Sequence, residues 1–413
     1  MNKKEVSEIK KQFTPDNCAI TRICCCYVDG EKNKKAETSD AFLSLPEEER
    51  FKYFEIFRKT LSGTIGKNLL TMDFPLDSEM PGGGQHFLLK LRGSHLEDTE
   101  LLEQFYDKII DSYDYGENYL ILLIHAMYDI PGKSSDNLDL FDASDEVFDY
   151  ILCSICPVKL SKAGLSYDSQ ENCFRNRTRD WIVELPDRGF LFPAFHDRST
   201  DLHSLLYYSK NAEDLHEAFM ESLSGCTMPM TAKDQKETFN ALVEETLGDS
   251  CDYQLVRNIH EHLTEMLEEK ADDPEPLLLD KQQVRRLLEE SGADEEKMEA
   301  FDYNFDQTAG AGASLLVSNV ANTRKFEVKT PVITVQVDPD CADLVETRII
   351  DGRRCLVIGI DENVMVNGIA VSATEKGQMD ETPSREMAPW EDTARTEASS
   401  QAAAAFMTSD QPK

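Results

Sequence analysis

Through about residue 230, the apolar positions alternate between helical spacing and short continuous runs. Residues 46–61 and 99–113 carry apolar side chains three and four positions apart, which predicts amphipathic helices. Pro46 suits the first turn of one helix, and Thr99 suits the cap of the other. Short apolar runs bounded by Gly, Pro, Asp or Asn predict strands at Ile20–Val28, 85–91, 118–125 and 189–195. This pattern predicts an α+β domain around a mixed sheet over residues 1–230.

Between residues 231 and 312 the pattern becomes helical throughout, and acidic residues outnumber basic ones. The predicted helices cover residues 231–247, 252–270, 280–290 and 294–307. Gly248 stands just past the end of the first helix, and Asp280 and Asp294 suit N-caps. An acidic face on an amphipathic helix is usually solvated, so this charge by itself does not indicate a docking surface for a basic partner.

Beyond residue 312 the pattern is that of β-structure. Asp-Gly and Asn-Gly pairs at 351–352 and 367–368 are two-residue turn signals, and each lies between apolar segments. Apolar and polar residues alternate over 333–337, as in a half-buried strand. We predict a small antiparallel β module over residues 313–372. Residues 373–413 are rich in Ala, Ser, Thr, Glu and Asp, and they bury too little apolar surface to offset the entropy of ordering, which predicts a disordered tail.

The chain has 413 residues, and its 43 Lys and Arg against 78 Asp and Glu leave a net charge of −35. Phosphate binding needs clustered cations, so the charge excludes a general polyanion binder and restricts nucleic-acid contact to local basic patches. One such patch is the Lys-rich N-terminal region, with Lys3, Lys4, Lys10, Lys11, Lys32, Lys34 and Lys35.

The longest apolar run, residues 119–127, is too short to span a bilayer. The N-terminus also lacks the apolar stretch of a secretory signal, so we expect a cytoplasmic protein without membrane contact. Eleven cysteines without an export signal indicate reduced thiols.

Two groups of cysteines deserve separate consideration as metal or redox sites. Cys24, Cys25 and Cys26 lie on a predicted strand, where alternation points the middle thiol to the opposite face from its neighbours. Cys153 and Cys156 have the spacing of half a zinc site, but no second pair follows. Free cysteines are usually buried, so we interpret both groups as core residues.

Several sequences resemble catalytic motifs but lack an essential residue. A phosphate loop at 63–68, a dinucleotide fingerprint at 310–315, a zinc-protease helix at 260–264 and a nucleophile elbow at 164–168 are each incomplete. The glycines at 82–84 precede a predicted strand, so they offer no helix N-terminus to a phosphate. Because these motifs are incomplete, the sequence does not support membership of the commonest enzyme classes.

One polar segment, residues 195–204, follows an apolar strand and concentrates His, Asp and Arg. With a His and an Asp near the end of another predicted strand, it could supply ligands to a divalent metal or form acid–base pairs. The candidate residues are His125, Asp129, His196, Asp197, Asp201 and His203. A plain turn, in which Asp, Ser and Thr bond the local backbone, is the more common use of such residues. The metal hypothesis fails if these side chains share no pocket.

A second polar segment places Arg175, Arg177 and Arg179 at alternate positions before Trp181. On a strand these arginines would share one face and could bind phosphate or carboxylate, with the indole as a stacking surface. The alternative is a solvated strand edge that discourages aggregation.

A resemblance to a known family rests on five stretches: KKEVSEIKKQFTPDNCAITRICCCYVDGEKNKK, NYLILLIHAMYDIPGK, DASDEVFDYILCSICPVKLSKAGLSY, FLFPAFHDRSTDLHSLLYY and SNVANTRKFEVKTPVITVQVDPDCADLVETRIIDGRRCLVIGI. They resemble a domain of unknown function found mainly in low-GC Gram-positive bacteria, and the resemblance covers roughly residues 1–372. It implies a bacterial cytoplasmic protein and no particular chemistry. Cys25 stands where that pattern would lead us to look for Gly. The order of segments is also similar to that of nucleoid-associated proteins, although likeness of architecture does not establish function.

Two classes of function remain. The incomplete motifs, acidic helices and tail favour a non-enzymatic interaction or regulatory protein that binds a protein partner or itself, with nucleoid association as one form. The alternative is a metal-assisted hydrolase that uses the segment 196–203. The sequence does not identify a cofactor and does not decide whether the protein is an enzyme.

Overall fold

A computed structural model describes residues 1–133, 139–140, 146–226, 228–323, 325–359, 364–366 and 369–371. The chain divides into two compact units, Met1–Val357 and Ile358–Lys413. The segment boundaries that we predict at residues 230 and 312 stay predictions. Within the described residues, no helix is long and apolar enough to cross a membrane.

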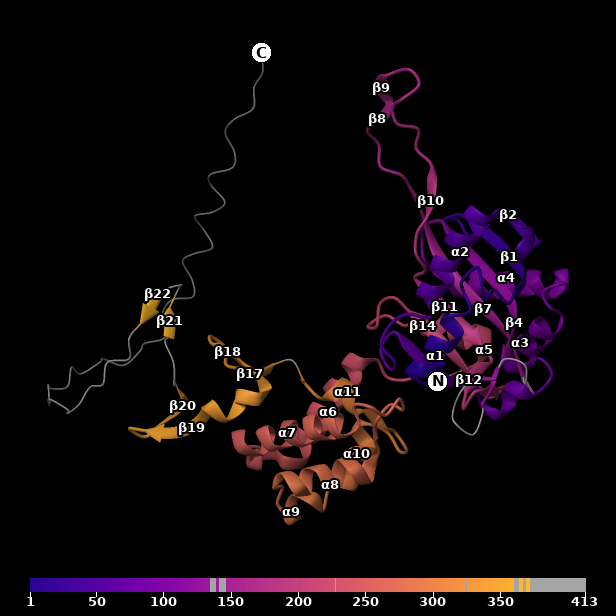
Figure 1. Ribbon diagram of the computed structural model, residues 1–413. Coiled ribbons are helices and arrows are strands. Elements are labelled where there is room, and N and C mark those ends of the chain that lie inside the picture. Colours follow the sequence, from indigo (N-terminus) through magenta and orange to yellow (C-terminus); the bar gives the residue numbers. More distant parts are fainter. Residues whose placement is uncertain are drawn as a thin grey trace, which may run out of the picture. The chain divides into compact units, whose positions relative to one another are not determined.

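The main sheet runs in the order β2-β1-β4-β7-β11-β14-β3, with β10 beside the end of β7 (Figure 1). Its strands are β1 (Ile20–Val28), β2 (Lys34–Ala41), β3 (Leu69–Asp73), β4 (Tyr119–Ile130), β7 (Glu146–Leu160), β10 (Trp181–Val183), β11 (Arg188–Phe192) and β14 (Ser204–Ser209). Each of these pairings is antiparallel. The α+β class is therefore confirmed, but the sheet is antiparallel where we predict a mixed one.

Helices cover both faces of this sheet and form two separate cores. On one face lie α3 (Gly84–Gly93), α4 (Thr99–Ser112) and α5 (Glu217–Ser224), and on the other lie α1 (Lys3–Lys10) and α2 (Glu47–Thr60). Successive strand residues alternate between the cores, so that Leu123 packs in the first and Leu122 in the second. Because the central strands are buried on both faces, their sequences are continuous apolar runs. Each buried Leu stabilises the fold by about 1.5–3 kcal/mol.

The same alternation places the cysteine triplet. Cys24 and Cys26 are fully buried in the core beneath α3 and α4, whereas Cys25 packs against the opposite core. Burial raises the pKa of Cys25 to about 11 and that of Cys26 to about 12. Cys153 and Cys156 are also buried on β7. The interpretation of these thiols as core residues agrees with their positions.

The prediction of a strand at residues 85–91 is wrong, because this segment forms α3. Its apolar residues Phe87, Leu88 and Leu91 have helical spacing and are buried on one side. The preceding glycines therefore do lead into a helix. A Cβ on Gly84 would lie 2.4 Å from backbone atoms of Ser224, so the glycine permits close packing. Ser78 Oγ accepts a hydrogen bond from Gln85 N and so satisfies a donor at this N-terminus.

Two predicted helices form with small corrections at their starts. Pro46 is the N-cap of α2 and lies just before its first turn. The helix α4 begins at Thr99, but its cap is Asp98, whose carboxylate accepts hydrogen bonds from Glu100 N and Leu101 N. Of the predicted strands, Ile20–Val28 matches β1. The strand predicted at 118–125 covers the first half of β4, and the one predicted at 189–195 is divided between β11 and β12 (Ala194–His196).

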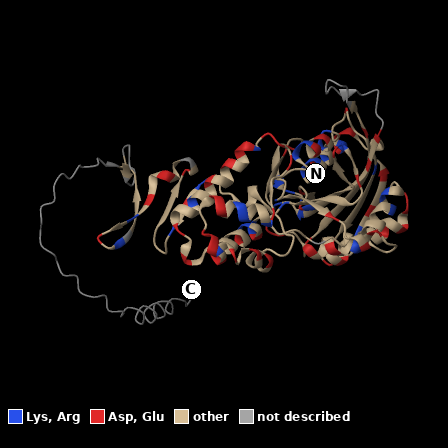
Figure 2. Cartoon of the chain, turned by 90° about the horizontal axis from the view of Figure 1, so that it is seen from below, with Lys and Arg blue, Asp and Glu red and all other residues tan. Residues whose placement is uncertain are grey.

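The acidic segment forms helices around a third core that includes Leu242, Leu263 and Leu288. Its helices are α6 (Ala232–Leu247), α7 (Tyr253–Glu269), α8 (Lys281–Ser291), α9 (Glu295–Met298), α10 (Phe301–Thr308) and α11 (Val317–Val320). Asp280 forms a capping box with Gln283 at the start of α8. The predicted helix over 294–307 is two helices, and Asp294 makes no capping bond with its side chain. Asp and Glu residues lie along the helices with Lys and Arg interspersed (Figure 2).

The remaining strands form two-stranded sheets. They are β5 (Gly132–Lys133) with β6 (Asp139–Leu140), β8 (Leu165–Asp168) with β9 (Cys173–Asn176), β12 (Ala194–His196) with β13 (Ser199–Asp201), β15 (Leu278–Leu279) with β16 (Leu315–Leu316), β17 (Phe326–Lys329) with β18 (Thr334–Val337), β19 (Val345–Ile350) with β20 (Arg353–Ile358), and β21 (Val364–Val366) with β22 (Ile369–Val371). Asp351 and Gly352 have φ values of 50° and 73°, as the predicted turn requires. The turn at 367–368 and the tail at 373–413 lie outside the described residues.

Candidate functional site

Strand register brings a histidine and a carboxylate together on the α3 side of the sheet. His125 on β4 pairs with Ile151 on β7, and Asp149 lies two residues away along β7 on the same face. His125 Nε2 is 2.7 Å from Asp149 Oδ1. The imidazole is fully buried, whereas the Asp149 side chain is 28% exposed. One member of the pair therefore lies in the core of the sheet, and the other reaches solvent.

A β-bulge supplies the partner of the other imidazole nitrogen. Ile20 pairs with Ala126 and Arg22 pairs with His125, which leaves Thr21 as an extra residue in β1. Thr21 Oγ1 lies 2.6 Å from His125 Nδ1 and donates to the His125 carbonyl at 3.1 Å. When the hydroxyl donates to the carbonyl, Nδ1 must carry the proton that joins it to Thr21. Nε2 then requires a proton or a metal cation to face the Asp149 carboxylate.

A second imidazole comes from the turn after α3. The His95 ring stacks on His125 with 4.6 Å between ring centroids. His95 and Leu96 both have left-handed backbone, with φ of 51° and 59°, which costs about 1 kcal/mol or more for each non-glycine residue. The turn is held because Leu96 is fully buried and its carbonyl accepts a hydrogen bond from the Cys24 thiol. Packing of Leu96 thus keeps His95 at the exposed edge of the pair.

The surroundings favour the ionised form of Asp149. Partial burial would raise the pKa of this carboxyl, but the hydrogen bond from His125 and the positive charges of His125, Arg92 and His95 outweigh it. The pKa is therefore lowered. Arg92 Nε lies 3.7 Å from Asp149 Oδ2. An ionised carboxylate beside two imidazoles can accept a proton or bind a cation.

His95, His125 and Asp149 can each offer one ligand atom, and these atoms lie within 4.8 Å of one another. Two imidazoles and a carboxylate are the donor set of many catalytic zinc and non-haem iron sites, which leave further positions for water or substrate. Tetrahedral zinc holds its donors about 3.3 Å apart, so His125 Nε2 and Asp149 Oδ1 would separate by roughly 0.6 Å to admit the ion. Thr21 is placed to orient His125, as an oxygen on the second nitrogen does for ligating histidines.

The structure places the six residues of the predicted cluster in several different surroundings. His125 belongs to the cluster above, and Asp129 lies exposed on β4 opposite Val147. His196 lies 3.8 Å from Glu5 and 3.7 Å from Asp197. Asp201 accepts hydrogen bonds from His203 N and Ser204 Oγ. His203 Nδ1 lies 2.9 Å from Glu79. Only His125 of these six is part of the described three-residue group.

Sequence reasoning missed His95 and Asp149. His95 follows a segment that the sequence analysis assigns to a strand, so its turn is not recognised as the end of a helix. Asp149 lies near the start of β7, a long strand that is not among the predicted strands. Alternation along β7, where Asp149 shares a face with Ile151, is the signal that could have found it.

The three arginines do not lie together on one strand. Arg175 lies on β9 and pairs with Asp168 at 2.6 Å. Arg177 and Arg179 follow the end of β9, and Arg179 Nε donates to the Ser161 carbonyl. Anion binding by these residues stays a prediction.

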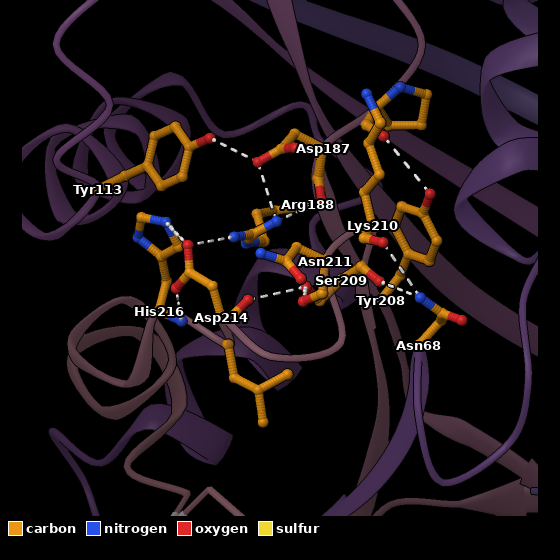
Figure 3. A network of polar contacts seen from close by, with 12 residues as sticks. Asn68, Tyr113, Asp187, Arg188, Tyr208, Ser209, Lys210, Asn211, Asp214 and His216 are labelled. Atoms are coloured by element: carbon orange, nitrogen blue, oxygen red, sulfur yellow. Dashed lines mark hydrogen bonds and ion pairs between the residues drawn. The ribbon is translucent and has the colours of Figure 1, made fainter. Parts of the chain in front are cut away.

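A further polar network surrounds Arg188, which is almost fully buried (Figure 3). Its guanidinium lies 2.9 Å from Asp187 Oδ2 and 3.1 Å from Asp214 Oδ2, and His216 Nε2 lies 3.2 Å from the same Asp214 oxygen. These contacts tie β11 to the segment after β14. We interpret the network as structural, because a buried guanidinium requires anionic partners.

The family model of a domain of unknown function, DUF4317, matches residues 1–369. The chain belongs to the DUF4317 family. No curated protein and no solved structure matches the chain. Membership of the DUF4317 family assigns no activity, so a function for the chain has to be argued from its own residues.

Proposed function

We propose that this DUF4317 chain binds a divalent metal ion of the zinc class through His95, His125 and Asp149, and that the bound ion supports metal-assisted hydrolysis. The observation that carries the proposal is the convergence of the three ligand atoms within 4.8 Å. The proposal retains His125 from the hydrolase hypothesis and replaces its other ligands.

The chemistry follows from an incomplete coordination shell. Three protein ligands leave a position for water, and a zinc ion lowers the pKa of that water to about 7, so that hydroxide is available at neutral pH. Thr21 orients the buried imidazole through Nδ1. His95 and Asp149 are both accessible to solvent, which gives a substrate a route to the ion.

Metal analysis of the purified protein tests the binding step. We expect one zinc per chain after dialysis, and at least tenfold weaker zinc binding for His95→Ala and for Asp149→Asn. Because His95 is exposed, its replacement separates loss of a ligand from loss of the fold. His203→Ala is the matched control, since this exposed histidine lies in another contact set. Equal zinc binding by His95→Ala and the unmodified chain would overturn the proposal.

Hydrolysis is tested separately with p-nitrophenyl acetate and bis(p-nitrophenyl) phosphate. We expect zinc-dependent turnover of at least one of these esters and its loss in Asp149→Asn. A chain that binds zinc but leaves both rates at the background level would contradict the hydrolase function while leaving the metal site intact.

A second proposed function is that of a non-enzymatic interaction or regulatory protein, as the sequence favours. It is supported by the large apolar side chains that β8 and β9 expose, including Leu165 and Phe174. Nucleoid association is the form of this function that requires binding to DNA. Binding of duplex DNA at increasing salt tests it, because phosphate contacts weaken steeply with salt concentration. Location in a bacterial cytoplasm is part of the same proposal.

A further inference from the structure

Arg92 places a guanidinium beside the proposed metal site, and its Nε lacks a hydrogen-bond acceptor. The side chain is 19% exposed, and Nε lies 3.7 Å from Asp149 Oδ2, which is too far for a hydrogen bond. The Nε atom is buried and donates no hydrogen bond within the part of the chain that the structure describes. A buried N–H group without an acceptor is unfavourable, so an anion that reaches Arg92 would be stabilised there.

The end of α3 positions both Arg92 and His95. Arg92 lies in the last turn of α3, and its carbonyl accepts a hydrogen bond from His95 N at 2.9 Å. The His95 ring stacks on His125, whereas the Arg92 guanidinium faces Asp149. Asp149 Oδ1 lies against His125 Nε2, and Asp149 Oδ2 lies toward Arg92. One oxygen of the carboxylate therefore adjoins the proposed metal position, and the other adjoins the guanidinium.

A bound zinc ion would make this site cationic. The carboxylate of Asp149 is one of the three proposed ligands, and ligating imidazoles are neutral. The two positive charges of the ion and the permanent charge of Arg92 then face a single negative charge. Arg22, which pairs with His125 across β1 and β4, does not alter this balance, because Glu97 compensates it at 3.0 Å. The loaded site therefore attracts an anion, although the whole chain carries a charge of −35.

The sheet beside Asp149 presents an apolar surface followed by an acidic residue. Met127 pairs with Asp149 across β4 and β7, and Val147 lies two residues from Asp149 on the same face. Met127 and Val147 are 41% and 42% exposed, so they can contact the organic part of a ligand. Asp129 is exposed and pairs with Val147, which adds negative charge farther along this face. These surroundings favour a single anionic group on an apolar molecule over a polyanion such as nucleic acid.

We propose that the substrate of this site is a small phosphate ester, and that Arg92 determines this specificity by binding one phosphate oxygen while zinc binds another. The inference rests on the metal-assisted hydrolysis proposed above and names its substrate class. A phosphate group presents neighbouring anionic oxygens, and a guanidinium matches them with paired N–H donors. An uncharged carboxyl ester offers Arg92 no such partner, so its hydrolysis does not depend on this residue.

The reaction is a hydrolysis that requires no co-reactant other than water. Water gives hydroxide to phosphorus, the bond between phosphorus and the ester oxygen breaks, and the departing oxygen or the buffer takes the remaining proton. The transition state spreads negative charge over the equatorial phosphoryl oxygens. Arg92 lies where it can stabilise that charge, so it contributes to kcat as well as to KM for phosphate esters.

Calorimetric titration of the dialysed, zinc-loaded chain with inorganic phosphate tests the anion site without turnover. We expect Arg92→Ala to weaken phosphate binding at least tenfold and Arg92→Lys to weaken it less, because lysine keeps the charge but not the paired donors. Zinc affinity should be unchanged or higher in Arg92→Ala, because a neighbouring cation repels the ion. If Arg92 served only to position Asp149, its loss would weaken zinc binding instead.

Lys90→Ala is the matched control for the loss of a cation from this helix. Lys90 is exposed on α3 two residues before Arg92, so the two side chains point to different sides of the helix. Its replacement should leave phosphate affinity and zinc content unchanged. Equal phosphate affinity of Arg92→Ala and the unmodified chain would overturn the inference, whatever the rates of hydrolysis.

Selectivity between two esters tests the substrate class. Bis(p-nitrophenyl) phosphate and p-nitrophenyl acetate share a leaving group, so the ratio of their kcat/KM values reports the contribution of the phosphate. We expect this ratio to fall at least tenfold in Arg92→Ala. A chain that binds zinc and hydrolyses only the acetate overturns this inference and leaves the proposed function standing, whereas a chain that retains no zinc overturns both. Preference for single-stranded DNA over the small diester would also overturn the inference.

Discussion

His125 and Asp149 lie diagonally across β4 and β7, with Nε2 of the buried imidazole 2.7 Å from Oδ1 of the partly exposed carboxylate. Thr21 on the other side and His95 above the ring complete the contacts of His125. The relationship depends on the register of β4 and β7 and on a bulge in β1. Its consequences for stability can be measured without knowledge of a substrate.

Replacing His125 with Ala should lower the free energy of unfolding by about 2–4 kcal/mol, because it opens a cavity and leaves a partly buried carboxylate without its hydrogen bond. Urea denaturation measures the loss. His95→Ala is the comparison, since an exposed ring contributes less, and we expect a change within about 0.5 kcal/mol. Equal effects of the two substitutions would contradict the burial difference between these rings.

Asp149 should make the protein sensitive to acid. Its pKa is lowered in the folded chain, so the stabilisation is present above the ordinary carboxyl pKa of 3.8 and is lost as pH falls through the lower folded value. We expect the melting temperature of the unmodified chain to fall more steeply below that pH than that of Asp149→Asn. Parallel curves for the two proteins would show that the carboxylate is not preferentially ionised in the fold.

Gly84→Ala should destabilise the protein by about 2 kcal/mol or more, because the added Cβ would lie 2.4 Å from backbone atoms of Ser224. Gly93 lies at the other end of the same helix, and a Cβ there would meet nothing within 4 Å. Gly93→Ala should therefore be neutral or stabilising by up to about 1 kcal/mol. Thermal denaturation of the two variants measures both effects in one helix: Gly93→Ala reports the gain in helix propensity, and Gly84→Ala reports the cost of the steric clash.

The cap of α4 can be assigned by a matched pair of substitutions. Asp98→Ala removes the acceptor of two backbone hydrogen bonds and should cost about 1 kcal/mol. Thr99→Ala should change the stability by less than about 0.5 kcal/mol, because Thr99 is not the capping residue. Chemical denaturation measures both changes in stability. A larger loss for Thr99→Ala than for Asp98→Ala would show that Thr99 is the cap, as the sequence suggests.

The thiols should differ sharply in reactivity. Burial raises the pKa of Cys153 well above its usual value and that of Cys26 to about 12, so neither forms appreciable thiolate near neutral pH. Cys173 and Cys341 are exposed. Alkylation of the native protein with iodoacetamide, followed by peptide mass spectrometry, should modify the two exposed thiols first. Modification of Cys153 at a comparable rate would indicate that β7 opens to solvent.

Local sequence accounts for the elements whose conformation depends on neighbouring residues. Asp280 caps α8 as predicted, since its side chain accepts a hydrogen bond from the backbone N–H of Gln283, three residues away. The strand Ile20–Val28 matches its prediction because a run of apolar and β-branched residues ends at polar turns. The α+β class follows from such elements. None of this requires knowledge of what each element packs against.

The strand predicted at 85–91 shows where local pattern was insufficient. A short apolar run is compatible with a buried strand or with a buried helix, and the burial of Phe87, Leu88 and Leu91 under α4 and α5 decides for the helix. At position 84 the packing leaves no room for a Cβ, because the backbone of Ser224, which is distant in sequence, lies against Gly84. Packing therefore overrides the local preference of this segment.

The sequence by itself determined most of the helical pattern, the strand Ile20–Val28, the turn at Asp351 and the burial of Cys24, Cys26, Cys153 and Cys156. These features depend on side-chain spacing and on contacts within a few residues. The tertiary structure decided that His125 meets Asp149 and His95, because that meeting depends on strand register and on a turn held by buried Leu96. It also decided that Phe174 on β9 is left exposed. Contacts between residues distant in the chain are set by the pairing of whole elements, and no local pattern records that pairing.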